Sequence, residues 1–150
     1  MAGVVEEQVA NSWLFNRMTT APTLVAYVGS RVYLKIAPTS TTGNPVVFPL
    51  IRYIPMSHTD IKAIGSVGPK RPWTSHRYVI GGVEKVGSTA QLKDIMGIVD
   101  GLFDEVQDVY QGQQIDCWRT GVLDPAPYTI GTDQYRELQL QFRLMMQPVS

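Results

Sequence analysis

The chain has 150 residues, 44% of them hydrophobic, which is enough to bury the core of one ordinary globular domain and too little for two. Thirteen basic residues balance thirteen acidic ones, so composition gives no reason to expect binding to nucleic acid or to a membrane surface. A single cysteine excludes an intramolecular disulfide, and we find neither an export signal nor an apolar run of the ~20 residues that span a bilayer. We therefore expect one soluble domain covering residues 1–150.

Two helices are predicted near the N-terminus. In residues 4–19, apolar side chains recur at steps of four, as one face of a helix requires: Val5, Val9 and Trp13. Ala21-Pro22 interrupts this pattern, and Gly29 ends a short second helix.

Strands and loops are predicted to follow, up to residue 86. Residues 31–36 and 46–53 favour extended structure, and Pro49 makes the second of these an edge strand or a bulged one, because proline cannot donate to a ladder. Residues 55–73 are predicted to be a long mobile loop, since they lack a period and become rich in Gly and Pro. A strand resumes at residues 75–86, with Gly81-Gly82 as a bulge or bend.

The strongest pattern lies between Gly87 and Gly112 and predicts one long amphipathic helix. Ser88, with Gln91 three residues later, is typical of a capping box, and Gly112 suits a helix end. The apolar face follows spacings of three and four: Leu92, Ile95, Met96, Val99, Leu102, Phe103, Val106 and Tyr110. The opposite face is acidic and carries Asp94, Asp100, Asp104, Glu105 and Asp108.

The C-terminal third predicts two more strands. Residues 114–120 alternate between apolar and polar side chains, residues 121–133 are predicted to be a loop, and residues 138–144 alternate most clearly. Clustered strands with helices on one side indicate an α+β fold. We expect a mostly antiparallel four- to five-stranded sheet, with an N-terminal helix and the long amphipathic helix packed on one face.

No motif predicts a cofactor, a metal or catalysis. His58 and His76 have no other His or Cys at metal-ligand spacing. Cys117 alternates with polar positions on a strand, which is more typical of a small buried hydrophobe than of a nucleophile. A small soluble enzyme using Cys117 or His76 is kept as the alternative from a different functional class.

Charge is divided unevenly along the chain. Between Arg52 and Arg77 five cations stand against one acid, whereas the predicted long helix has the reverse imbalance. Opposite surfaces of this kind suit heterologous contacts, and such contacts form rings when they close, although an uneven division without function explains the same pattern. The candidate partner interface is Lys62, Lys70, Arg71 and Trp73; the candidate lumen or inter-subunit surface is Asp94, Asp100, Asp104, Glu105 and Asp108.

Several stretches together resemble the tail terminator, or tail-completion, proteins of long-tailed bacteriophages. They are an N-terminal helix followed by PTLVAYVGSRVYLKIAP, a proline-containing strand at NPVVFPLIRY, a strand leading into the long helix, and a final YRELQLQFRLMM strand after a loop carrying Asp133. The resemblance covers residues 8–146, and its most specific part is the spacing of Gly29, Arg31-Val32-Tyr33 and Ala37-Pro38.

The resemblance implies a virion protein without an active site or cofactor, assembled in the host cytoplasm. Its subunits would form a ring, by family analogy a hexamer, at the head-proximal end of the tail. The ring would stop polymerisation of the tail tube protein, offer a surface to the head-tail connector or neck protein, and let DNA pass through its lumen without specific binding or contact with a membrane. A head-side neck or adaptor protein is the alternative within the same class.

Overall fold

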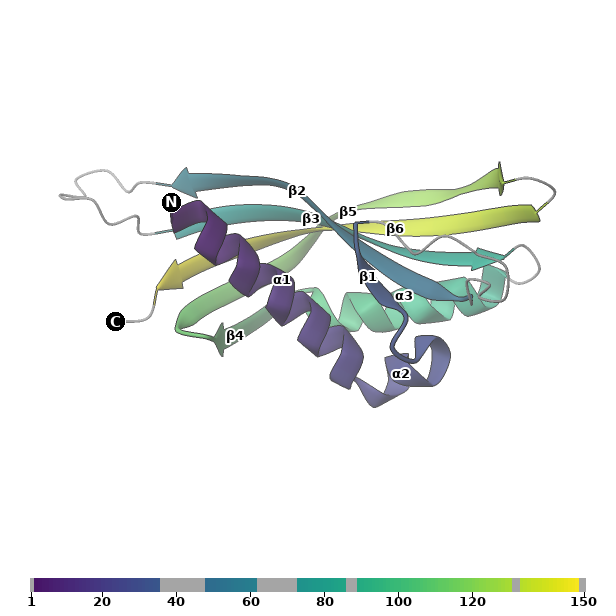
Figure 1. Ribbon diagram of the computed structural model, residues 1–150, viewed down its shortest axis with the longest axis horizontal. Helices are drawn as coiled ribbons and strands as arrows, with labels where there is room; N and C mark the ends of the chain where they lie inside the picture. Colours follow the sequence, from purple (N-terminus) through teal and green to yellow (C-terminus); the bar gives the residue numbers. More distant parts are fainter. Residues whose placement is uncertain (1, 36–47, 62–72, 86–88, 131–132, 149–150) are drawn as a thin grey trace, which may run out of the picture.

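The computed structural model describes residues 2–35, 48–61, 73–85, 89–130 and 133–148, which form three helices and six strands (Figure 1). In chain order these elements are α1 (Ala2–Thr20), α2 (Pro22–Val28), β1 (Val32–Leu34), β2 (Leu50–Ile61), β3 (Trp73–Lys85), α3 (Thr89–Phe103), β4 (Val106–Tyr110), β5 (Gln113–Ile130) and β6 (Asp133–Pro148). The strands form one sheet in the order β1-β2-β3-β6-β5-β4. Pairing between β1 and β2 is parallel and the other pairings are antiparallel, which confirms the mostly antiparallel sheet but gives six strands instead of four to five.

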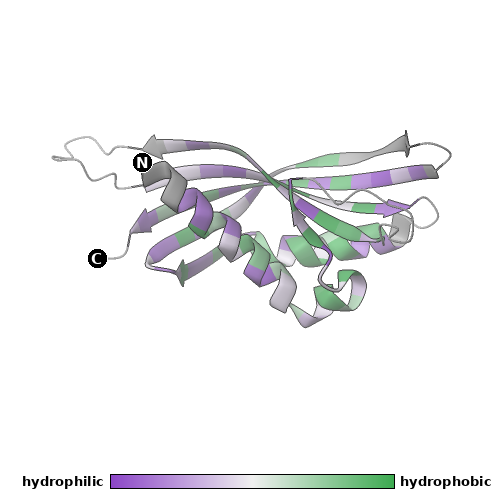
Figure 2. Cartoon of the chain, in the orientation of Figure 1, coloured by the Kyte–Doolittle hydropathy of each residue, from purple (hydrophilic) through white to green (hydrophobic). Residues whose placement is uncertain are grey.

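The described helices lie on one side of this twisted sheet, and the core lies between the two layers (Figure 1). Trp13 and Leu14 of α1 are buried there together with Phe142 and Leu144 of β6. Along β6, these inward residues alternate with Gln139, Gln141 and Arg143, and Figure 2 shows the matching alternation of hydrophobic and hydrophilic bands. This confirms the alternating strand predicted at residues 138–144.

Both N-terminal helices are confirmed. Leu24 and Val28 of α2 are fully buried, and Pro22 stands in the first turn of α2, where a missing N–H costs nothing. Gly29 ends α2 at φ +58, a backbone conformation that favours glycine.

The predicted loop at residues 55–73 is wrong at both of its ends. β2 continues through Pro55 to Ile61, and β3 begins at Trp73; residues 62–72 lie outside the described residues. Pro55 lies beyond the stretch where β2 pairs with β1 and next to a bulge between Pro55 and Ser57, and proline is tolerated in such a place. The bulge in β2 is therefore at Met56 and not at Pro49, which directly precedes the strand.

The predicted loop at residues 121–133 is also wrong, because β5 runs on to Ile130; residues 131–132 lie outside the described residues. The register of β5 against β6 shifts between Arg119 and Gly121 and again between Leu123 and Ala126. The second shift absorbs Pro125, which a regular ladder would not accept.

The long helix predicted between Gly87 and Gly112 is too long. α3 ends at Phe103, Asp104 and Glu105 form a turn, and Val106–Tyr110 is the edge strand β4. Gln111 (φ +48) and Gly112 (φ +75) connect the paired residues Tyr110 and Gln113, which is the pattern of a type I′ hairpin turn. Gly112 thus has a positive φ because it lies in a hairpin turn and not at the predicted helix end.

Gly81 and Gly82 do not form the predicted bulge, since β3 keeps a regular register with β2 and β6 through both residues. The two glycines make room on opposite faces of the sheet. A Cβ on Gly82 would lie 2.7 Å from Sδ of Met96 and 3.0 Å from Cδ1 of Leu92, so α3 packs directly on the β3 backbone. A Cβ on Gly81 would lie 3.0 Å from Oε1 of Glu137 on the other face.

Candidate interaction surfaces

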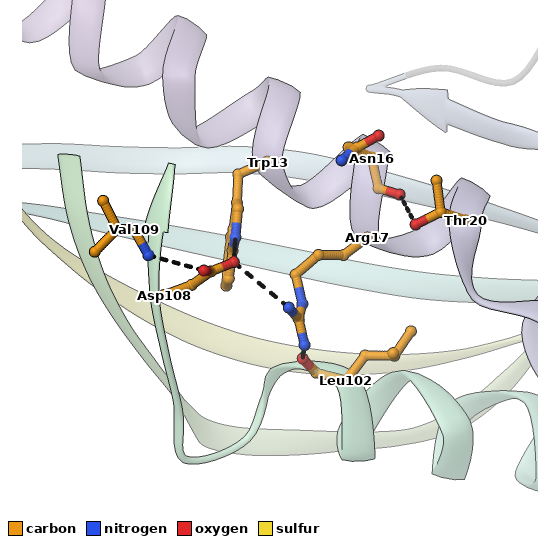
Figure 3. A network of polar contacts seen from close by, with 7 residues as sticks. All are labelled: Trp13, Asn16, Arg17, Thr20, Leu102, Asp108 and Val109. Atoms are coloured by element: carbon orange, nitrogen blue, oxygen red, sulfur yellow. Dashed lines mark hydrogen bonds and ion pairs between the residues drawn. The ribbon is translucent and has the colours of Figure 1, made fainter. Parts of the chain in front are cut away.

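A polar network joins α1, the end of α3 and β4 (Figure 3). Nε and Nη2 of Arg17 donate to the backbone oxygen of Leu102, at 3.1 and 2.9 Å. Nε1 of Trp13 donates to Oδ2 of Asp108 at 2.9 Å, and Nη1 of Arg17 lies 3.6 Å from the same oxygen. Asp108 therefore fixes β4 against α1.

The position of Arg17 explains why the network is stable. Leu102 lies in the last turn of α3, where backbone oxygens lack helical partners and the helix dipole favours a cation. The guanidinium carbon also lies 5.3 Å from the centroid of the Trp13 ring, which itself packs edge-on against Phe103.

Two further acids of the predicted acidic surface are bound by Arg119 of β5. Nη1 of Arg119 lies 2.7 Å from Oδ2 of Asp100, and the backbone N–H of Arg119 donates to Oδ1 of Asp104 at 2.9 Å. These contacts tie the end of α3 to the sheet. With Asp108, three of the five predicted acids thus serve contacts within the subunit.

Asp94 and Glu105 are the two predicted acids that stay exposed. Asp94 is on the solvent side of α3, opposite the buried Leu92, Ile95 and Met96, and Glu105 is in the turn after α3 at φ +54. Neither side chain has a hydrogen bond or ion pair with the described part of the chain. Of the predicted partner interface, Trp73 begins β3 and is half-buried, whereas Lys62, Lys70 and Arg71 lie outside the described residues.

The face of the sheet turned away from the helices carries a second group of charges, here called the outer face. By strand register it presents Arg52 of β2, Ser75, Arg77 and Val79 of β3, Glu137, Gln139, Gln141 and Arg143 of β6, and Asp116 and Trp118 of β5. Arg52 forms a bidentate pair with Glu137, both N···O distances being 2.7 Å. The pair passes over Gly81, whose missing side chain allows β2 and β6 to meet across β3.

Arg77 and Arg143 are directly opposite each other on the outer face, in the register between β3 and β6. Neither side chain forms a hydrogen bond or ion pair with the described residues, and Nε of Arg143 is buried without a partner there. A hollow of about 340 Å³ opens beside Arg77, lined also by Met56, Val79, Thr120 and Gln141. In the sequence, the polar residues that alternate along β6 predicted one wet face that includes Arg143, but they did not predict that Arg143 lies opposite Arg77.

His76 and Cys117, the residues of the enzyme alternative, are both 1% exposed. Nε2 of His76 lies 3.0 Å from Oγ1 of Thr74, and its ring stacks on His58 with centroids 6.0 Å apart. Burial raises the pKa of the Cys117 thiol, which keeps it protonated in the core. That the chain is not an enzyme stays a prediction.

Two kinds of feature are absent from the described residues. No group of three or more His, Cys, Asp or Glu side chains there is placed to hold a metal ion. No described helix combines the length and apolar character that crossing a membrane requires.

Comparisons with known proteins show similarity of fold. No protein-family model matches the chain, and no curated protein matches it significantly. A chain from the solved virion of a native gene transfer agent particle superposes with a TM-score of 0.66 and 17% sequence identity, covering 89% of this chain and 91% of its own length. A second solved chain superposes with a TM-score of 0.58 and 13% identity, covering 92% of this chain and 94% of its own length. The fold described above is therefore also the fold of a chain in a solved virion.

Proposed function

We propose that the chain is a structural virion protein of a phage-like particle, acting as a tail terminator. In this role, copies of the chain form a ring, by family analogy a hexamer, on the head-proximal end of the tail tube. The ring ends polymerisation of the tube protein and provides the surface that meets the head-tail connector, while DNA passes through its lumen. The observation that carries the proposal is the shared fold with a gene transfer agent virion chain over 89% of this chain.

The chemistry of the interior supports a protein that works through its surfaces. The two side chains considered for catalysis are buried, and the thiol is held protonated. Exposed charges, in contrast, are found on both layers, among them Asp94 and Glu105 on the helical layer and Arg77 on the outer face. Separated charges of opposite sign suit contacts between unlike surfaces, and such contacts close into rings.

The proposal is tested by deleting the gene from the genome that encodes it and imaging the particles by negative-stain electron microscopy. A tail terminator predicts overlong tubes without heads, and re-expression of the intact chain should restore tail length. Isolated tails of normal length would instead favour a neck or adaptor protein on the head side. Complete particles with normal tails after deletion would refute both roles.

A further inference from the structure

The exposed charges of the chain sort into two sets when the pairs within the subunit are removed. Arg17, Arg52 and Arg119 contact Asp108, Glu137 and Asp100 respectively, so these charges stabilise the subunit itself. Among the described side chains, Arg77, Arg143 and Asp116 remain on the outer face, and Lys93, Asp94 and Glu105 remain on α3 and in the turn that follows it. Cations are therefore in excess on the outer face, by two to one, and acids are in excess around α3, by two to one.

The two arginines are placed to receive an anion. Like charges directly opposite on neighbouring strands repel each other, so Arg77 and Arg143 destabilise the isolated sheet unless an acid lies between them. Asp116 is on the same face, level with Met145, but no ion pair joins it to Arg143. The hollow beside Arg77 offers room for one side chain, and the amide of Gln141 at its wall can donate a further hydrogen bond.

Glu105 fits this receptor better than Asp94 does. Its side chain is one methylene longer, and it is exposed in the turn after α3, at φ +54. Asp94, in contrast, follows the exposed Lys93, whose charge would be repelled by the two arginines.

We propose that copies of this chain contact each other back to front, with Glu105 of one copy entering the hollow on the outer face of the next and pairing with Arg77 and Arg143. The inference rests on the proposed ring, because a contact between unlike surfaces repeats from copy to copy until it closes. Beyond the proposed ring, the inference specifies which two surfaces are in contact and which charged residues stabilise that contact.

The experiment uses two complementary variants of the full chain, measured by native mass spectrometry and sedimentation velocity. Arg77→Glu/Arg143→Glu makes the receptor acidic, and Glu105→Lys makes the inserted group basic. Each variant alone should need on the order of a hundredfold higher concentration to assemble, since each then sets like charges against each other. An equimolar mixture should assemble again, because each variant presents the charge that the other lacks and the copies can alternate around the ring.

Matched controls separate a specific contact from a change in net charge. Asp94→Lys changes the charge as Glu105→Lys does, and Lys35→Glu reverses an exposed cation at the end of β1; both should assemble like the unmodified chain. Circular dichroism of every variant checks folding. If the double arginine variant does not fold, Arg77→Gln/Arg143→Gln replaces it, with a smaller expected loss of assembly.

Three results would overturn the inference: equal loss for Asp94→Lys and Glu105→Lys, no recovery in the mixture, or a chain that stays monomeric at every concentration and with tube protein. Rings that form regardless of these substitutions would remove this contact and leave the proposed ring in place. Conversely, charge-dependent assembly with normal tails after gene deletion would remove the tail terminator role and leave the contact.

Discussion

Replacing Arg17 with methionine tests whether the network of Figure 3 stabilises the fold mainly by capping α3 or by pairing charges. Methionine keeps most of the apolar stem of the arginine and removes the guanidinium. The change leaves the backbone oxygen of Leu102 without its two donors, at 3.1 and 2.9 Å, and removes the cation from the Trp13 ring. It also removes the ion pair with Asp108.

The magnitudes differ enough to be separated. A hydrogen bond from a charged donor contributes roughly 1.5–3 kcal/mol, and the cation over the ring contributes about 0.5–1 kcal/mol at an exposed site. The ion pair is longer, at 3.6 Å, and both side chains are partly exposed, 29% for Arg17 and 39% for Asp108. Solvent screening limits such a pair to about 0.2–1 kcal/mol. Since these contributions overlap, we expect Arg17→Met to cost about 2 kcal/mol and Asp108→Asn, which keeps an acceptor for Trp13, about 0.5 kcal/mol.

Urea unfolding of both single variants and of the double variant gives the coupling energy directly. A coupling of about 0.5 kcal/mol or less, with a large cost for Arg17→Met alone, would agree with capping. Asn16→Ala, at the exposed neighbouring position on α1, should stay within about 0.5 kcal/mol of the unmodified chain. If Arg17→Met cost no more than Asp108→Asn, the assignment to the Leu102 oxygen would be wrong.

Two other substitutions test the packing of α3 on β3. Gly82→Ala should lower the free energy of unfolding by about 1–3 kcal/mol, because the new Cβ meets the buried Met96 at 2.7 Å. Gly101→Ala is the control: the new Cβ lies in open space on α3 and should raise the free energy of unfolding by about 0.5–1 kcal/mol. Equal effects of the two substitutions in urea unfolding would contradict the close approach of α3 to β3. Burial raises the pKa of Glu84, and a hydrogen bond from the Leu92 backbone opposes this shift. The favourable contribution of Glu84 to the free energy of unfolding is therefore present below its unfolded pKa of about 4.3 and is lost as pH rises through the higher folded pKa. Glu84→Gln should therefore stabilise the chain at neutral pH in thermal unfolding, with a gain that shrinks on acidification; a gain independent of pH would contradict this.

The elements predicted correctly are those whose signals lie within a few residues. The helical period of α1, the proline that begins α2 and the glycine that ends it are all local, and the structure has them as expected. The alternation of β6 is local as well. The predictions failed where a partner strand decides the outcome. Pro55 in β2 and Pro125 in β5 lie within the two stretches predicted to be loops, yet each lies at a bulge, and a bulge exists only in relation to the strand beside it.

The error at the end of α3 has a different physical cause. Val106 and Tyr110 are four residues apart, which satisfies a helical period and equally the period of two in a strand. Only the pairing of Val106 with Cys117 and the positive φ of Glu105 distinguish the two, and neither is visible without the fold.

Charge counting along the sequence identified the acidic region but treated every acid as equally free. Asp108 contacts α1 and Asp100 contacts β5, because the chain folds distant cations onto them. The fold therefore decides which acids stay exposed and without a partner, and Glu105 is one of them because it lies in a turn that faces solvent.

The outer face carries charged residues both with and without a partner in the same subunit. Arg52 and Glu137 show that this sheet can close an ion pair across a glycine, with both partners in the same subunit. Two residues further along β6 from Gln141, the same sheet places Arg143 opposite Arg77, and no described acid forms an ion pair with either arginine, at a cost to the isolated subunit. A cost of this kind is relieved when a second molecule brings a carboxylate, since that contact then replaces a repulsion with an attraction. In the proposed ring, the subunit would therefore gain more from assembly than the new ion pair alone contributes.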